Sequence, residues 1–164
     1  MTPLADTLRI VLIGIGATAV MDLWLLALGR FGVPTLNFAY IGRWAGHFAR
    51  GRFFHAAIAR AEPVSGELAL GWLVHYGIGI AFAALLVLAE GADWAHRPTL
   101  IPAVLVGVIT VLAPLLVMQP AMGAGIASSR TPTPLKNCLR SLANHTVFGI
   151  GLYLSATVVA SSLR

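Results

Sequence analysis

Four apolar stretches, each about as long as a helix that crosses a lipid bilayer, dominate this sequence and limit its possible folds. They cover roughly residues 8–29, 68–89, 99–118 and 139–160. A helix needs about 20 apolar residues to cross the roughly 30 Å hydrocarbon core. Only 10% of the 164 residues are charged, whereas soluble domains usually carry about 25%. The sequence therefore predicts an all-α fold, a bundle of four transmembrane helices forming one integral membrane domain over residues 1–164.

The basic residues lie between the apolar stretches and predict an orientation. Eight of the eleven Lys and Arg residues lie in the first and third loops, namely Arg30, Arg43, Arg50, Arg52, Arg60, Arg130, Lys136 and Arg140. Because basic loops remain on the cytoplasmic side, we expect both loops in the cytoplasm and both termini outside. The net charge of +5 is not gathered into a groove-sized cluster, so we predict the lipid bilayer as partner and no nucleic acid.

The first loop contains an amphipathic segment, residues 40–61. Ile41, Trp44 and Phe48 recur at helical spacing, with arginines beside them. This pattern predicts an amphipathic helix at the membrane interface, between the first and second spans. We expect its lipid contacts to come from Arg43, Trp44, Arg50 and Arg52. Glu67, at the start of the second span, is expected to cap that helix or lie at the interface.

Three ionisable residues interrupt the apolar stretches: Asp22, His75 and His145. Each lies on a line of mostly small residues at i, i+4 and i+8: Gly14, Thr18 and Asp22; Gly71, His75 and Gly79; Ser141, His145 and Gly149. Small residues let helices approach closely, so these polar groups are expected on helix–helix faces. Asp22 lies eight residues before Arg30, or about 12 Å from the helix end. With Met118 and Gln119, which end the third span, the three predict a ligand or proton site in the cytoplasmic half.

Several chemistries suit such a site. Two imidazoles and a carboxylate could ligate a transition metal, with His75, His145 and Asp22 as ligands, and two histidines could hold haem. An Asp beside a His could relay protons or gate a solute. The structural alternative is that Asp22 pairs with His145 or Arg140 and that His75 bonds a backbone carbonyl. Cys138 is the only cysteine, which excludes a cysteine-based metal site.

Three functions follow from these chemistries. The leading hypothesis is a membrane protein that binds a small ligand, ion or proton at Asp22, His75 and His145, in transport or membrane homeostasis. If the protein transports a solute, this hypothesis implies a homo-oligomer, because four helices are few to form a solute pathway within one subunit. The alternatives are a haem- or metal-binding redox protein and a non-catalytic accessory or scaffold subunit. No serine or cysteine nucleophile motif occurs, so the residues favour a role other than catalysis.

Several blocks of the sequence carry a resemblance to a known family. They are residues 21–24 (MDLW), 42–47 (GRWAGH), 71–76 (GWLVHY), 118–125 (MQPAMGAG) and 129–132 (SRTP). Together they resemble a bacterial inner-membrane family classified only as a domain of unknown function. The resemblance covers nearly the whole chain and implies a multi-pass protein of the bacterial inner membrane. It implies no substrate, cofactor or catalytic residue.

Overall fold

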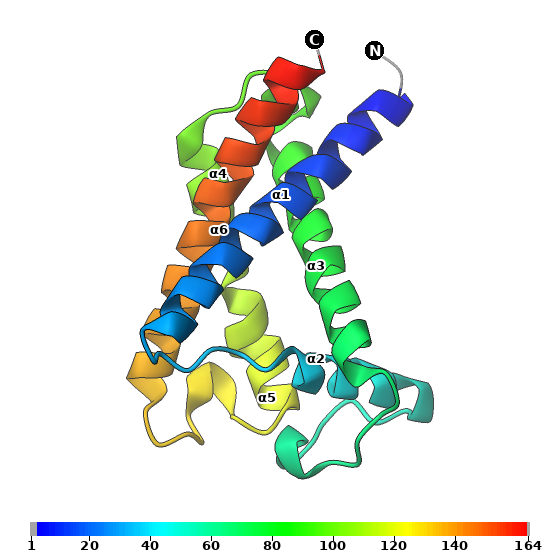
Figure 1. The fold of residues 1–164 in the computed structure, drawn as a ribbon, viewed down its shortest axis with the longest axis vertical. Helices are drawn as coiled ribbons and strands as arrows, with labels where there is room; N and C mark the ends of the chain where they lie inside the picture. The colour runs from blue at the N-terminus through cyan, green and yellow to red at the C-terminus, as the bar shows by residue number, and fades with distance from the viewer. Residues whose placement is uncertain (1–2, 164) are drawn as a thin grey trace. The chain divides into compact units, whose positions relative to one another are not determined.

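The structure is a computed structural model that describes residues 3–163, and every regular element in that range is helical. Four long segments dominate it: α1 (Pro3–Arg30), α3 (Glu67–Glu90), α4 (Leu100–Thr110) with its continuation to Ala121, and α6 (Pro134–Ser162) (Figure 1). Each is long and apolar enough to cross a membrane. The predicted all-α fold with four helices of spanning length is therefore confirmed.

Large apolar side chains on these helices point away from the protein. Leu73, Leu88 and Ile101 are each more than 70% exposed. A soluble protein rarely leaves so much apolar surface open to water. This exposure is what helices surrounded by lipid require, and it agrees with the apolar composition.

The segment expected to form one interfacial helix, residues 40–61, is helical only in its first part. Helix α2 (Phe38–Gly46) begins after Asn37, whose side chain accepts a hydrogen bond from the Ala39 N–H at 3.0 Å. A 3-10 turn (His47–Arg50) follows and ends at Gly51, which adopts φ +69°. Because glycine adopts this left-handed conformation readily, it ends the helix there. The position of α2 at a membrane interface stays a prediction.

The third spanning segment is interrupted by a proline. Helix α4 ends at Thr110, and a π-helical turn (Pro114–Met118) leads into α5 (Gln119–Ala121). Pro114 has no N–H to donate to the carbonyl four residues earlier, so regular α-helical bonding cannot continue through it. The wider π turn accommodates the missing hydrogen bond. Such turns often lie near functional positions.

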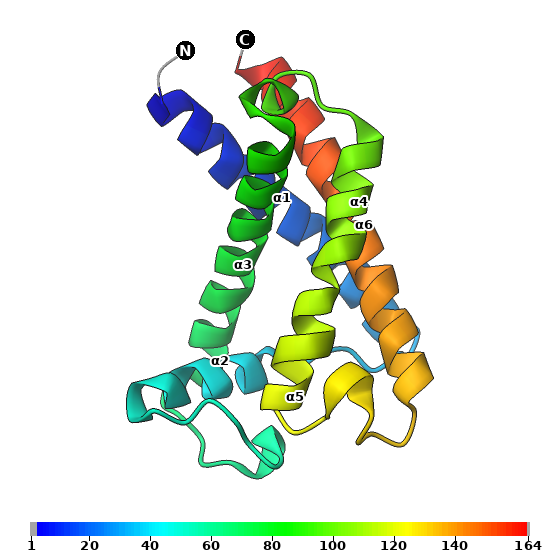
Figure 2. The same ribbon diagram turned by 180° about the vertical axis from the view of Figure 1, so that it is seen from behind.

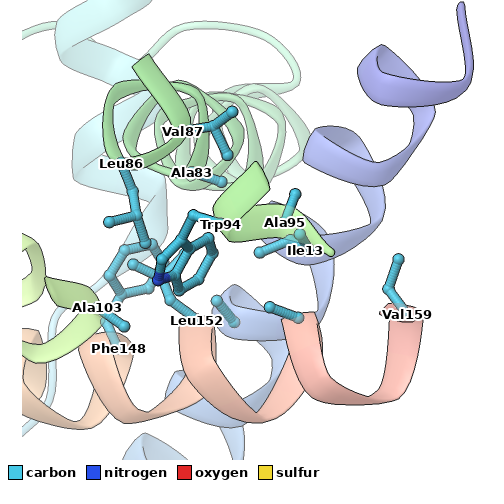
Figure 3. Packing of buried hydrophobic residues seen from close by; sticks show 12 residues of the cluster. Ile13, Ala83, Leu86, Val87, Trp94, Ala95, Ala103, Phe148, Leu152 and Val159 are labelled. Carbon is cyan, nitrogen blue, oxygen red and sulfur yellow. The ribbon is translucent and has the colours of Figure 1, made fainter. Parts of the chain in front are cut away.

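The described chain contains two compact units. The single integral membrane domain over residues 1–164 stays a prediction. The first unit comprises Met1–Pro34, Tyr76–Thr110 and Ala143–Arg164. Its core includes Ile13, Leu86 and Leu152, all fully buried, and Trp94 reaches into this cluster from the loop after α3 (Figure 3). The first turns of α1 and the last turns of α6 lie at the same end of this unit (Figures 1 and 2).

Small residues bring the helices of the first unit together. A methyl group on Gly14 of α1 would lie 2.5 Å from the Cα atom of Ile80 of α3. A methyl group on Gly107 of α4 would lie 2.6 Å from the Cα atom of Gly149 of α6. These backbones are therefore in direct contact, as the small-residue lines through Gly14 and Gly149 predicted.

The second unit comprises Thr35–His75 and Val111–Leu142. Its apolar core is small and is centred on Ile41, Ile58 and Met122. The loop after α2 is hydrogen-bonded to the turn after α5, where the His55 N–H donates to the carbonyl of Ala121 at 2.8 Å. The Ile58 N–H donates to the carbonyl of Met122 at 3.0 Å. The long first loop is thus an ordered part of this unit.

Candidate functional site

Asp22 is paired with a tyrosine in the first unit. The Tyr76 hydroxyl of α3 donates to Asp22 Oδ2 of α1 at 2.9 Å, and both side chains are half-buried. The structural alternative paired Asp22 with His145 or Arg140, and the sequence did not single out Tyr76. Its only signal in the sequence is a phenol inside an apolar stretch. A carboxylate that accepts a hydrogen bond from a half-buried phenol is a group that can bind a proton.

His145 also has a partner within the first unit. Its Nδ1 atom lies 3.0 Å from Thr110 Oγ1, and the Thr110 hydroxyl donates to the carbonyl of Gly107 at 2.7 Å. A hydroxyl has a single hydrogen, so this network assigns the donor role to the imidazole Nδ1–H. The Nε2 atom of neutral His145 then carries a lone pair, which can accept a proton.

A third polar contact joins α1 and α6 in the same unit. The Trp24 indole N–H donates to Asn144 Oδ1 at 3.0 Å. Trp24 lies two residues after Asp22, and Asn144 directly precedes His145. These three polar contacts each join two helices of the first unit. The sequence singled out Asp22 in one of them and His145 in another.

His75 lies in the second unit, among aromatic rings. Its ring centroid is 4.6 Å from that of Phe38 and 5.8 Å from that of Trp72. Asp22 and His145 belong to the first unit, so a site shared by all three residues stays a prediction. Among residues 3–163, no group of three or more His, Cys, Asp or Glu side chains is arranged to hold a metal ion.

Gln119 and Met118, the other predicted site residues, lie at the π turn of the second unit. Gln119 Oε1 accepts a hydrogen bond from the Ser128 hydroxyl at 2.9 Å, and its Nε2 lies 3.5 Å from Ser141 Oγ. Met118 packs against the apolar core of the unit. Both side chains thus make contacts within the second unit. Ligand binding by Gln119 and Met118 stays a prediction.

Arg43, which we expected among lipid headgroups, is buried inside the second unit. Its Nε and Nη2 atoms donate to the two carboxylate oxygens of Glu67 at 2.8 and 2.7 Å. Its Nη1 atom donates to the carbonyls of Ile58, Ala59 and Ala61 at 3.1–3.3 Å. The hydrogen bond to Glu67 raises the pKa of Arg43 further above its usual value. This guanidinium therefore ties the first loop to α3. Trp44, Arg50 and Arg52 stay predicted lipid contacts.

Glu67 also caps its own helix, which is one of the two roles expected from the sequence. Its Oε2 atom accepts a hydrogen bond from the Val64 N–H, three residues earlier, at 3.0 Å. A side chain that reaches back in this way satisfies a free N–H at the helix start. The same carboxylate thus caps α3 and holds Arg43, and only the first role could be read from local spacing.

A pair of histidines lies beside this ion pair. The fully buried His47 has its Nε2 atom 3.0 Å from the carbonyl of Glu62 and its Nδ1 atom 2.7 Å from His55 Nε2. Because a carbonyl only accepts, His47 carries its hydrogen on Nε2 and accepts from His55. Burial and the neighbouring His47 lower the pKa of His55, so His55 is neutral near pH 7.

The chain was compared with protein families, curated proteins and solved structures. No curated protein and no solved structure matches it. One family model, described as "Protein of unknown function (DUF2938)", matches residues 11–159. The match covers most of the chain, and it confirms the resemblance to a family of unknown function. The chain therefore belongs to the DUF2938 family.

Proposed function

We propose that this chain is a multi-pass membrane protein that binds and transfers a proton at Asp22, in transport or membrane homeostasis. The observation that carries the proposal is the Asp22–Tyr76 hydrogen bond between two apolar helices. A charged side chain inside a bilayer costs at least about 2.5 kcal/mol, and such residues usually belong to ion or proton pathways. A carboxyl group that alternates between its charged and neutral forms suits that role.

The other polar contacts of the first unit support a relay. His145 offers an Nε2 lone pair, which can accept a proton. Trp24 and Asn144 add a hydrogen-bonded pair between α1 and α6. A proton needs only a chain of hydrogen-bonding groups, so one copy of the chain suffices for this function. A larger solute would require a homo-oligomer, and His75 stays a predicted member of the site in either case.

The test is proton flux into liposomes that contain the purified protein and a trapped pH-sensitive dye. We expect the wild type to carry flux above protein-free liposomes, and Asp22→Asn to lower it about tenfold or more, as loss of an essential proton carrier does. The matched control is Asp93→Asn, which makes the same change at an exposed carboxylate outside the spanning helices. Normal flux through Asp22→Asn would contradict the proposal.

One observation favours a second candidate function, an accessory or scaffold subunit. The polar side chains of the first unit are bonded to one another across its helices, as they would be in a purely structural bundle. If this function holds, the wild type carries no flux and Asp22→Asn lowers the amount of folded protein instead. The liposome assay and the yield of folded protein therefore separate the two candidates.

We also propose that the protein lies in the bacterial inner membrane with its termini outside and its basic loops in the cytoplasm. The distribution of Lys and Arg supports this orientation. In a Cys138→Ser background, we expect an impermeant maleimide to label Ser161→Cys in cells with a permeabilised outer membrane. Arg52→Cys should react only after the inner membrane is opened. Both positions are exposed. The reverse labelling pattern would invert the proposed orientation.

A further inference from the structure

A cavity of about 620 Å³ lies in the first unit and is partly open to the surroundings. Helix α1 contributes Arg9 to its wall, and the loop before α4 contributes His96 and Pro98. The last turns of α6 supply the remaining wall, which includes Tyr153, Thr157 and Ser161. Asp22 is not among the residues that line this cavity. The proposed proton transfer at Asp22 does not involve this cavity.

Arg9 is buried in the wall with most of its hydrogen-bonding groups unused. Its side chain lies in a residue only 4% exposed, and its Nη2 atom donates to the carbonyl of Leu163. Its Nε and Nη1 atoms have no hydrogen-bond partner among residues 3–163. A buried guanidinium without a counter-charge is strongly unfavourable, so this one calls for an anionic acceptor.

Within residues 3–163, the neighbouring polar groups do not supply that acceptor. The carboxylate of Asp6 pairs with the imidazole of His96, whose Nε2 atom lies 3.4 Å away. The hydroxyls of Thr157 and Ser161 donate to carbonyls of their own helix at 2.9 and 2.8 Å. Their hydrogens are therefore committed, and Arg9 contributes unused N–H donors to the wall. An occupant must bring oxygen acceptors and negative charge.

We propose that this cavity binds a phosphate group through the unused N–H groups of Arg9, with His96 beside it. Arginine suits this ligand because it stays charged and offers several donors in one plane, and charge-assisted hydrogen bonds to phosphate are short and strong. A phospholipid headgroup and a free phosphate share this chemistry. The cavity is large enough for either, and Pro98 and Ala160 give its wall apolar parts that a lipid glycerol could contact.

The test is the thermal stability of delipidated full-length protein in detergent, followed by tryptophan fluorescence. One arm adds inorganic phosphate, with chloride at equal ionic strength as its control. The other adds phosphatidylglycerol, with diacylglycerol as a lipid that has no phosphate. Ligands that bind only the folded state raise Tm, and we expect a rise of about 5 °C near saturation for at least one probe. Native mass spectrometry identifies the bound species.

Two variants test the role of Arg9, and a third is the control. Arg9→Gln should unfold no earlier than the wild type without a probe, because it removes an unpaired charge, and it should lose the response to the probe. Ala160→Leu keeps the charge and narrows the cavity, so it should lose the response even if Arg9→Gln fails to fold. Arg97→Gln removes an exposed charge from the same loop as His96 and should respond like the wild type.

The outcomes distinguish a lipid headgroup from free phosphate, and they also include results that would overturn the proposal. A response to phosphatidylglycerol alone identifies a lipid headgroup, and a response to inorganic phosphate identifies a free solute. Absence of any response in the wild type would overturn the proposal. So would an equal response in Arg9→Gln, or an equal loss in Arg97→Gln, which would indicate general surface charge. Because the assay measures stability, failure of the proton-flux proposal does not affect it.

Discussion

Replacing Gly71 with alanine is expected to destabilise the second unit by about 3 kcal/mol or more, at the upper end of the cost of overpacking. A methyl group on Gly71 would lie 1.9 Å from the carbonyl oxygen of Phe38, and one on Gly42 would lie 1.7 Å from the carbonyl oxygen of Glu67. Both obstacles are backbone atoms, which cannot rotate away as a side chain can. Helices α2 and α3 would have to separate.

The matched control is Gly77→Ala in the same helix. Nothing lies within 4 Å of a methyl group at Gly77, so this change adds no clash. It should leave stability unchanged or raise it by about 0.5–1 kcal/mol, because alanine favours a helix over glycine. Unfolding in mixed micelles with increasing SDS measures both variants. Equal loss of stability in the two would show that glycine flexibility, and not close contact, matters in α3.

Replacing Arg43 with alanine is expected to cost about 3–5 kcal/mol, the cost of removing one partner from a buried ion pair. The side chains of Arg43 and Glu67 are only 10% and 18% exposed, so water cannot replace the lost partner. The change also frees three carbonyls of the first loop. Protease cleavage between residues 51 and 62 should therefore increase, and SDS unfolding should begin earlier.

Two further variants make this result specific. Arg43→Lys should not restore stability, because one ammonium cannot reach both carboxylate oxygens and three carbonyls. Arg50→Ala removes a similar charge from an exposed pair with Glu62, whose side chains are 57% and 64% exposed, and should change little. A loss in Arg50→Ala as large as that in Arg43→Ala would refute the central role of the buried pair.

Much of the fold could be predicted because local sequence and bilayer physics determine it. A spanning segment must be apolar for about 20 residues and must bond its own backbone, so length and composition reveal four helices. The lines through Gly14 and Gly149 likewise marked real helix contacts. The interfacial segment was predicted less well, because Gly51 ends its helix after Arg50 and the rest of the loop is held by hydrogen bonds to the turn after α5.

The partners of the polar residues could not be predicted in the same way. Asp22 is 54 residues from Tyr76, and Arg43 is 24 residues from Glu67. Spacing along one helix says which face a side chain occupies, but not which residue of another helix lies opposite. Arg43 therefore resembled an interfacial arginine.

The sequence by itself determined the solvent and the elements of this protein: an apolar medium, four long helices and ionisable groups within them. Only the tertiary structure decided how those groups are used. It pairs Asp22 with Tyr76 and His145 with Thr110, buries Arg43 against Glu67, and leaves Arg9 in a cavity wall with unused donors. The physical reason is that apolar burial depends on composition, whereas a hydrogen bond depends on where two helices meet.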